Sequence, residues 1–571
     1  MNPMRHLLCM VSFTAAITVY AQSPAPISSR NVVPAETEPG IPVTDKITTE
    51  KCSTCHIADQ NGNLTRISWM RTTPEGWEQA VKRMIRLNLV TLTPEEAHHI
   101  VAYLAEGHGL APEEIAPQHW WLEMRNPQSE FTPNAATRVA CASCHAFARP
   151  ETWYRSKTEW RLLVNMHMGY FPWSRFAAFY APPNSEMGTP DYSVPNEPNR
   201  APVDTALDYL TDHNPLHTEA WSSWRAQAKN PDLKGRWIIT ASAPGKGKYF
   251  GVMEVTAGPA PGLFRTDATL TRVFDKSKLS ILSQSTVYTG YEWRGSGMGE
   301  SLGAVRQVMI VSPDQSKIDG RWFWGGYNEF GLDVSARRDN GDMMVLGADV
   351  TSIRAGSTGV PVRVMGAKFP KDLQAADFDL GAGTHVLKVA AVKPDGADIL
   401  VDVDANAISG ARSVSVKGRT VPAAFSVYDK IDYIKISEPS ALAHLGSAGH
   451  PKGYVQFEAV AYNRGVDGKA NTADDINLGP IAVKWSMEEF ISRYNDDDAE
   501  FVGSISADGL FTPSAEGPNP QRRFNTNNTG DVWIVATYTD KAGNTEPLTA
   551  RSYLAVTVPA YVKWEQPEVG K

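Results

Sequence analysis

The stretch Lys51-Cys-Ser-Thr-Cys-His-Ile-Ala58 contains the pattern Cys-x-x-Cys-His, which returns as Cys-Ala-Ser-Cys-His over residues 141–145. Two thiols at this spacing near the start of a helix can reach both vinyl groups of one porphyrin, and the adjacent imidazole then lies over the iron. Two copies therefore predict two covalently bound haems c. The expected ligands are Cys52, Cys55, Cys141 and Cys144 for the porphyrins and His56 and His145 as proximal ligands of the irons.

Other uses of these cysteines fit the pattern less well. A zinc site would need two further Cys or His ligands for each motif, and a dithiol redox site would need a βαβ context that residues 51–57 lack. Disulfide geometry does not require a histidine after the second cysteine. The only other cysteine, Cys9, lies in the N-terminal segment considered next.

The N-terminus has the pattern of an export signal. Arg5 precedes an apolar run over residues 7–20 that ends on the small residue Ala21. This run is shorter than the roughly twenty apolar residues that a membrane span needs. We predict a signal peptide over residues 1–21, no membrane span, and a flexible Pro- and Ser-rich leader over residues 22–44.

The length and charge of the chain limit its class. With 571 residues, 55 basic and 63 acidic side chains, it should form several packed domains. A phosphate-binding surface would need clustered Lys and Arg, and no such run occurs. We therefore expect no nucleic-acid partner.

The segments after the two motifs resemble each other. Aligned on Trp77 and Trp160, Met84 of the first segment corresponds to His167 of the second, seven positions after the tryptophan. Seven residues are about two helical turns, so each pair should lie on one face of a helix. Since sulfur and imidazole both bind haem iron, we predict Met84 and His167 as the sixth ligands. The alternative methionines are Met70, Met166, Met168 and Met187, and the histidines expected at the surface or behind the ligands are His98, His99, His108, His119, His213 and His217.

A second helix should follow in each segment. The residues Pro94, Glu95 and Glu96 are typical of a helix start, as is Asp204, and the two helices carry Tyr-Leu at residues 103–104 and 209–210. We predict two α-helical cytochrome c repeats over residues 45–111 and 112–228. A thioether ligand raises the reduction potential of the iron relative to imidazole, so the two haems should differ in potential. Both axial positions of each iron are expected to be filled, which favours electron transfer over activation of a bound ligand.

From about residue 231 the sequence pattern is typical of a β protein, with short runs of alternating apolar and polar residues between turns. We predict a multidomain α plus all-β chain whose diheme head is followed by three antiparallel β units. These are a β-barrel domain over residues 229–338, an immunoglobulin-like domain over 339–430 and a C-terminal β-sandwich domain over 431–571. They are expected to serve as scaffold and docking surface.

Two acidic stretches in the β half could suggest a metal. Asp467, Asn471, Asp474 and Asp475 are rich in oxygen ligands, but their spacing does not match the twelve-residue calcium loop. We interpret this stretch as a hydrated turn. The acidic run over residues 496–498 is interpreted as a solvated loop.

The whole arrangement resembles the alpha subunit of quinohemoprotein amine dehydrogenase, through CSTCH, CASCH, the helices of Trp77 and Trp160 and their Tyr-Leu partners. This resemblance implies a periplasmic heterotrimer that oxidises primary amines to aldehydes. It implies a beta subunit that forms a propeller and a small gamma subunit that carries a cysteine tryptophylquinone. A soluble cytochrome c or copper protein would accept the electrons.

The cysteine count agrees with a quinone cofactor carried by another subunit. A cysteine tryptophylquinone needs a thiol, and all four cysteines that remain after export are assigned to haem. Substrate oxidation would then take place on another polypeptide, and no catalytic residue is assigned to this chain. Two other readings stay open: a self-sufficient diheme c-type peroxidase, and a haem-bearing protein whose β domains bind a surface.

Overall fold

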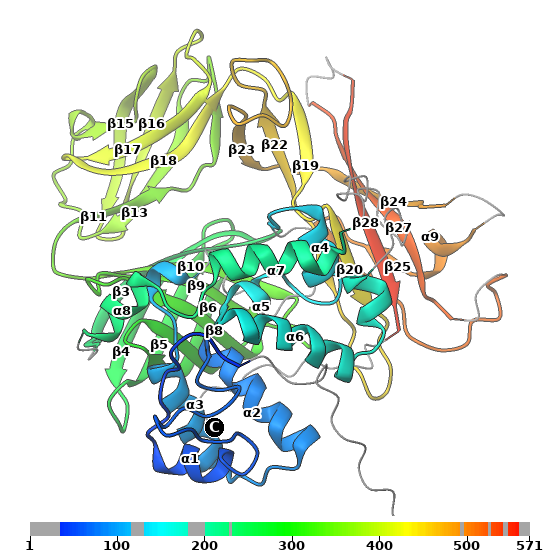
Figure 1. The fold of residues 1–571 in the computed structure, drawn as a ribbon. Helices are drawn as coiled ribbons and strands as arrows, with labels where there is room; N and C mark the ends of the chain where they lie inside the picture. The colour runs from blue at the N-terminus through cyan, green and yellow to red at the C-terminus, as the bar shows by residue number, and fades with distance from the viewer. Residues whose placement is uncertain are drawn as a thin grey trace, which may run out of the picture.

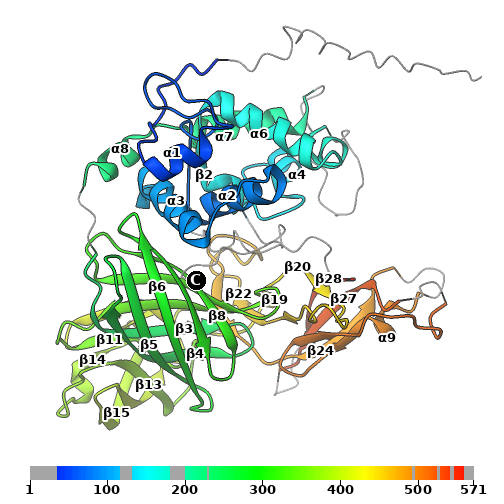
Figure 2. The same cartoon turned by 90° about the horizontal axis from the view of Figure 1, so that it is seen from below.

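A helical head packs on a β barrel that is followed by two further β units (Figures 1 and 2). The computed structural model describes residues 35–115, 131–180, 200–227, 231–491, 496–523, 527–540 and 546–558. The predicted signal peptide, most of the leader, His119 and Met187 lie outside these residues. Multidomain α plus β architecture is confirmed. Among the described helices, none has the length and apolar character needed to cross a membrane.

The first half of the head is built from short capped helices. Its elements are α1 (Lys46–Cys52), β1 (Met70–Thr72), α2 (Pro74–Asn88), α3 (Pro94–Gly107) and the 3₁₀ turn η2 (Pro112–Glu114). The side chain of Thr73 caps α2 by accepting from Gly76 N, and Thr93 forms a capping box with Glu96 at the start of α3. The predicted helix start at residues 94–96 is confirmed.

The second half repeats this order. Its elements are α4 (Ala135–Ala142), α5 (Ala148–Glu151), β2 (Trp153–Arg155), α6 (Lys157–Tyr170), the π-helical turn η4 (Arg175–Phe179), α7 (Pro202–His213) and α8 (Glu219–Arg225). Ser156 caps α6 as Thr73 caps α2, by accepting from the backbone N–H of Glu159. The second predicted helix is also confirmed, since Asp204 lies in the first turn of α7.

The two tryptophans have equivalent roles in the two halves. Trp77 Nε1 donates to His108 O at 2.9 Å, and Trp160 Nε1 donates to Asn214 O at 3.2 Å. Both acceptors cap the C-terminus of the helix that carries Tyr-Leu, so each tryptophan ties one long helix to the next. Strands β1 and β2 pair antiparallel between the two halves, with Met70 opposite Arg155.

The barrel is a closed eight-stranded sheet in the order β10-β3-β4-β5-β6-β7-β8-β9. Its strands are β3 (Gly235–Ala243), β4 (Gly247–Ala257), β5 (Leu263–Arg272), β6 (Lys278–Tyr288), β7 (Glu292–Gly299), β8 (Gly303–Val311), β9 (Lys317–Trp324) and β10 (Phe330–Arg338). Trp237, Trp293 and Trp322 are buried in its core. Closure leaves no free strand edge.

Strands β6 and β7 were not predicted individually from the sequence. β7 is rich in glycine, which weakens the strand signal. The structure shows why Gly297 is needed there: a Cβ atom would lie 2.3 Å from the backbone oxygen of Leu282 on β6. The glycines let the two strands approach closely.

The next unit contains two four-stranded sheets, β11-β13-β16-β15 and β12-β18-β17-β14. Its elements are β11 (Met344–Ala348), β12 (Ser352–Arg354), β13 (Val360–Ala367), η5 (Ala375–Asp377), β14 (Phe378–Asp379), β15 (Thr384–Lys393), β16 (Gly396–Val403), β17 (Gly410–Val416) and β18 (Arg419–Tyr428). One apolar core includes residues from both sheets, such as Val364 and Val427, as expected for a sandwich.

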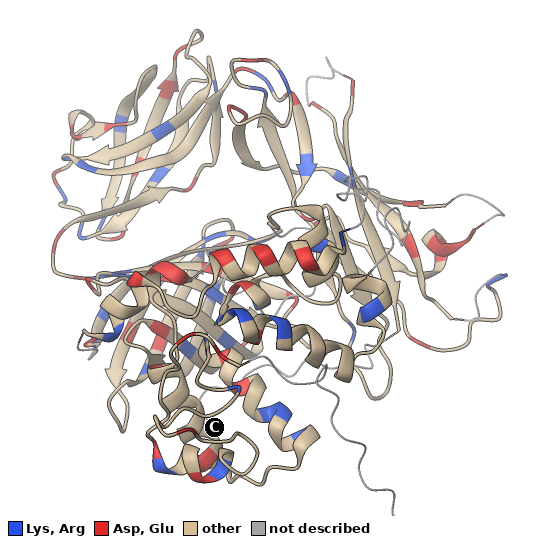
Figure 3. Cartoon of the chain, viewed as in Figure 1, with Lys and Arg blue, Asp and Glu red and all other residues tan. Residues whose placement is uncertain are grey.

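The last unit contains the sheets β19-β22-β23, β20-β28-β27-β24 and β21-β26-β25. Its elements are β19 (Tyr433–Ile436), β20 (Ser440–His444), β21 (Val455–Gln456), β22 (Ala459–Asn463), β23 (Ile476–Pro480), β24 (Lys484–Glu489), α9 (Asp498–Phe501), β25 (Gly503–Ile505), β26 (Leu510–Pro513), β27 (Gly530–Tyr538) and β28 (Leu548–Thr557). Acidic and basic side chains are interspersed over the described elements (Figure 3).

The two acidic stretches have different structures. Asp474 accepts from the backbone N–H groups of Val466 and Asp467, and Asp475 accepts from Tyr433 Oη, as in a hydrogen-bonded turn. Residues 496–498 were interpreted as a solvated loop, and this interpretation is wrong for Asp498. Asp498 is buried, lies in the first turn of α9 and forms an ion pair with Arg522.

Candidate haem-binding sites

The first Cys-x-x-Cys-His motif begins at the last residue of α1. The backbone N–H of His56 donates to Cys52 O at 2.9 Å, which holds the motif in a compact turn. His56 Nδ1 lies 2.7 Å from the carbonyl oxygen of Thr65. Because a carbonyl can only accept, Nδ1 carries the proton and Nε2 keeps its lone pair for a metal. Burial lowers the pKa of His56, which favours this neutral form.

The second motif begins near the end of α4 and has the same imidazole chemistry. His145 Nδ1 lies 3.0 Å from Ala146 O, so Nε2 is again the ring nitrogen that can bind iron. Burial, with a smaller effect of the Arg149 guanidinium, lowers the pKa of His145 to about 3. The imidazole is therefore neutral at physiological pH.

His167, the predicted second ligand of this iron, lies on α6. Its Nδ1 lies 2.9 Å from Leu163 O, one turn earlier in the helix, and its ring contacts Phe179 edge to face at 5.7 Å. Burial lowers the pKa of His167, and its charge is one of the contributions that lower the pKa of His145. Both imidazoles are therefore neutral at physiological pH, and each keeps a lone pair on Nε2. This donor set fits an iron with a histidine on each side.

The first site has a sulfur candidate on α2. Met84 is half-buried, and its Sδ accepts only a weak contact from Asn88 Nδ2 at 3.7 Å. The sulfur of the alternative Met70 is contacted by Arg155 Nη1 on the paired strand. This difference favours Met84, and its role as ligand remains a prediction. Met166 and Met168 lie on α6 of the second half.

Most of the remaining histidines are engaged elsewhere. His99 pairs with Asp45 at 2.9 Å, His213 stacks on Tyr209, and His217 Nε2 lies 2.7 Å from Pro39 O. His108, which was expected at the surface or behind the ligands, is fully buried. Its Nε2 lies 3.0 Å from Ile41 O, and burial lowers its pKa to about 4. His98 is exposed.

Both sites have apolar walls suited to a porphyrin. The buried cluster that Cys52 packs against consists of Val43, Leu64, Ile67, Trp77, Val81, Ile100, Val101, Leu104, Ala105 and Tyr288. The cluster that Cys141 packs against consists of Ala140, Val164, Ala178, Phe179, Val203 and Ala206. The residues present therefore fit the predicted haems c. Attachment through Cys52, Cys55, Cys141 and Cys144 remains a prediction.

Polar contacts join the two sites across the β1–β2 ribbon. Arg66 pairs with the buried carboxylate of Glu159 at 2.9 Å, and Arg149 Nη1 donates to Gln79 Oε1 at 2.5 Å. At the far ends of α2 and α6, Asn88 Nδ2 donates to Tyr170 Oη at 3.5 Å. These contacts connect the two repeats of the head.

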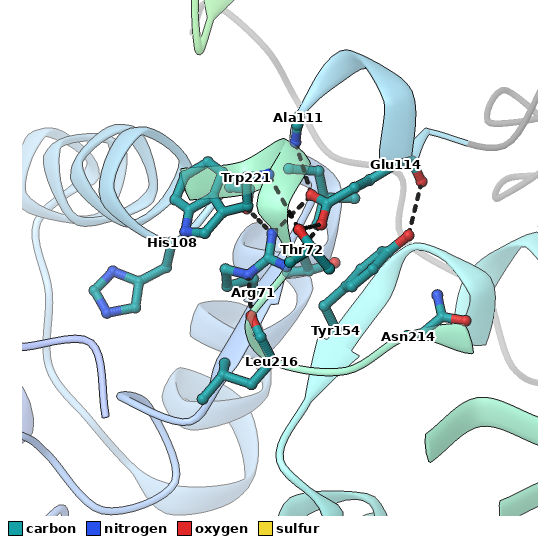
Figure 4. Close-up of polar contacts among 12 residues, drawn as sticks. Arg71, Thr72, His108, Ala111, Glu114, Tyr154, Asn214, Leu216 and Trp221 are labelled. Carbon is teal, nitrogen blue, oxygen red and sulfur yellow. Dashed lines mark hydrogen bonds and ion pairs between the residues drawn. The ribbon is translucent and has the colours of Figure 1, made fainter. Parts of the chain in front are cut away.

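A buried ion pair between β1 and η2 was not predicted from the sequence (Figure 4). Arg71 donates to both carboxylate oxygens of Glu114 at 2.8 Å and to Leu216 O at 2.6 Å. Its guanidinium also lies over the rings of Tyr154 and Trp221. These residues are far apart in the chain, and no local pattern could have indicated the pair.

The fold and the site define the class of protein: a helical double repeat with two c-type haem-attachment motifs, carried on β domains. Comparison with family models is more specific. The models match the haem-binding region at residues 43–181 and domains II, III and IV of the quinohemoprotein amine dehydrogenase alpha subunit at residues 230–339, 345–429 and 434–569. The chain belongs to the alpha-subunit family of quinohemoprotein amine dehydrogenase.

Solved structures show only remote likeness. A de novo designed fluorescence-activating β barrel is 16% identical, with 18% of this chain and 92% of that chain covered and a TM-score of 0.16. A human mucin-like protocadherin fragment is 12% identical, with 38% and 99% covered and a TM-score of 0.16. A titin tandem is 9% identical, with 49% and 92% covered and a TM-score of 0.11. No curated protein sequence matches the chain.

Proposed function

We propose that this chain is the diheme electron-transfer subunit of a periplasmic amine dehydrogenase. The observation that carries the proposal is the pair of Cys-x-x-Cys-His motifs in paired helical repeats, within a chain of this family. Haem iron, when bound, supplies reversible one-electron transfer. The chain's own residues attach the porphyrins and keep the imidazoles of His56, His145 and His167 neutral and oriented.

The partners follow from the family and from the cysteine count. A small gamma subunit would carry the cysteine tryptophylquinone that oxidises primary amines to aldehydes, and a beta propeller subunit would complete the heterotrimer. Every cysteine of the described chain lies in a haem motif, so the quinone's thiol must come from a partner. The two electrons of each turnover would leave singly, through the haems of this chain, to a soluble cytochrome c or copper protein.

Unequal axial ligands suit this role. The predicted pair His56 and Met84 gives a higher potential than the predicted pair His145 and His167, because a thioether stabilises the reduced iron more than imidazole does. With both axial positions filled, the sites are suited to passing electrons rather than to activating peroxide. The short β1–β2 ribbon and the contact between α2 and α6 support transfer between the two haems.

The native complex provides the test. We expect a denaturing gel to show haem on this chain and quinone on a small band, and a primary amine to reduce the haems in the absence of other donors. An intact mass without two added haems, or haems that do not respond to amine, would overturn the proposal. Peroxide turnover by this chain alone would support the peroxidase reading instead.

Cysteine variants refine the test. Cys144→Ser should lose one thioether bond at the second haem, which shifts the pyridine haemochrome band, while the first haem is unaffected. Ser143→Ala, inside the same motif, is the matched control and should leave both haems attached as in the unaltered chain.

A further inference from the structure

Arg155, at the end of β2, is a buried cation near the haem sites. Its side chain is 4% exposed, and its Nε has no hydrogen-bond partner in the described part of the chain. Its guanidinium lies over Trp153 at 4.1 Å and Trp160 at 5.5 Å, and Nη1 contacts Met70 Sδ. Among the described residues, no carboxylate forms an ion pair with it. Glu159 acts on Arg155 electrostatically, but it forms its ion pair with Arg66.

Elsewhere the chain pairs its buried arginines with its own carboxylates. Arg71 pairs with Glu114, Arg294 with Glu75, and Arg522 with Asp497 and Asp498. A buried charge without a counter-ion costs several kcal/mol. Arg155 is therefore an exception that calls for an anion from outside the polypeptide.

Arg83 on α2 is half-buried, and it is a second arginine whose charge acts on Arg155. Its Nε is buried without a hydrogen-bond partner, and it forms no ion pair with any described residue. The charges of Arg155 and Arg83 both act on the imidazole of His167. The two guanidinium groups come from different repeats. That of Arg155 lies 5.5 Å from the ring of Trp160 on α6, the helix that carries His167.

The group expected at that site carries carboxylates of its own, because each haem has two propionates. A guanidinium offers two parallel N–H donors that match a carboxylate, and this geometry is stronger than a single hydrogen bond. We propose that Arg155 and Arg83 bind the propionates of the haem held by His145 and His167. The proposal rests on the covalent haem attachment proposed above.

Such pairing would have a redox consequence. A buried positive charge favours the reduced iron, and hydrogen bonds around a haem are one of the ways in which a protein sets its potential. Arg155 and Arg83 would therefore raise the potential of the second haem toward that of the first. Because Arg83 extends from the helix that also carries Met84, the propionate contact would tie the two repeats together.

The experiment uses the full holoprotein with the propionate carboxylates labelled with carbon-13 through the haem precursor 5-aminolevulinate. Redox difference infrared spectra and the two midpoint potentials are measured for Arg155→Gln. The matched control is Arg161→Gln, which removes one exposed charge from α6, the helix of His167. We expect Arg155→Gln to shift the label-sensitive carboxylate band and to lower the potential of the lower-potential haem. Arg161→Gln should change neither.

An unchanged band and potential in Arg155→Gln, with both haems attached, would overturn the inference and leave the proposed function intact. Loss of covalent haem from the unaltered chain would instead remove the proposed function. Arg83→Gln is measured in the same way and decides the question if Arg155→Gln does not accumulate. The same two shifts in that variant support the inference, and their absence overturns it.

Discussion

At the scale of single residues, the imidazole tautomers carry most of the chemistry. His56, His145 and His167 each place Nδ1 against a backbone carbonyl, so each ring is oriented by the fold and keeps Nε2 for iron. Burial lowers all three pKa values. The three imidazoles predicted to bind iron are therefore oriented by backbone carbonyls rather than by acidic side chains.

Met84→Ala should lower the potential of the higher-potential haem and remove the sulfur-to-iron charge-transfer band, because a thioether ligand is lost. Visible absorption and redox titration measure both effects. Met70→Ala is the matched control and should keep the band, since Arg155 contacts the sulfur of Met70. The reverse result would make Met70 the ligand.

His167→Ala should open the sixth position of the second haem. The expected signs are a high-spin component in the electron paramagnetic resonance spectrum and binding of added imidazole. His213→Ala is the control, because that ring is stacked on Tyr209 and is not a predicted ligand. A low-spin spectrum that persists in His167→Ala would place the ligand elsewhere.

At the scale of elements, helix α2 is anchored to the barrel by a buried ion pair. Glu75, in the first turn of α2, binds Arg294 of β7, and both side chains are almost fully buried. Tyr291 Oη also donates to Leu110 O at 3.1 Å, and Thr289 N donates to Glu106 Oε2 at 3.1 Å. The barrel thus fixes the helix that carries Met84.

Glu75→Ala should destabilise the head–barrel unit by about 3–5 kcal/mol, because it removes one carboxylate partner of a buried guanidinium. Urea unfolding followed by haem absorption measures the loss. Glu50→Ala, which removes an exposed partner of Lys46, should cost less than about 1 kcal/mol. Similar costs for the two variants would contradict the anchoring role of Glu75.

Glu292 makes this interface sensitive to pH. Burial is the main reason that its pKa rises from 4.5 to about 8, and the charge of Glu75 adds to the effect. The folded protein therefore holds a proton that the unfolded chain has released, so the free energy of unfolding falls as pH rises from 4.5 to about 8.

Glu292→Gln should flatten this part of the stability curve and raise stability at pH 8, with about 1.4 kcal/mol expected for each unit of pKa shift removed. Thermal unfolding measured at several pH values from 5 to 8 tests this. Glu254→Gln, an exposed substitution on β4, is the control. A slope that persists in Glu292→Gln would assign the pH dependence to other groups.

At the scale of the whole molecule, the barrel contacts the head and both of the other β units. It binds the head through Arg294, the following β unit through Lys248, whose Nζ donates to Ala348 O and Val350 O, and the last unit through the Lys246–Asp508 ion pair. Figures 1 and 2 show these neighbours arranged around the green barrel. The three contacts use different strands or turns, so each unit should respond separately to mutation.

Lys248→Ala should loosen the second β unit by about 1.5–3 kcal/mol, the usual worth of hydrogen bonds from a charged donor. We expect faster proteolysis near residues 339–343 and unchanged haem potentials. Lys278→Ala, at an exposed position on β6, should leave proteolysis unchanged. A change of haem potential in Lys248→Ala would show that this unit is coupled to the head.

The sequence by itself determined the features that depend on local spacing. The Cys-x-x-Cys-His motifs, the long helices with Trp77 and Trp160, and the alternating runs of several barrel strands follow from residues within a few turns of one another. The glycine-rich strand β7 was missed because its residues have low intrinsic strand propensity, and pairing with β6 overrides that preference.

Only the tertiary structure decided where the buried charges go. Arg294 meets Glu75 across 219 positions of the chain, Arg71 meets Glu114, and Arg155 comes to lie over Trp160 on the helix that carries His167. The physical reason is that an ion pair depends on distance in space and on exclusion of water. Local periodicity encodes neither the distance in space between two side chains nor the exclusion of water from them. It does encode the covalent haem motif and the helical repeat.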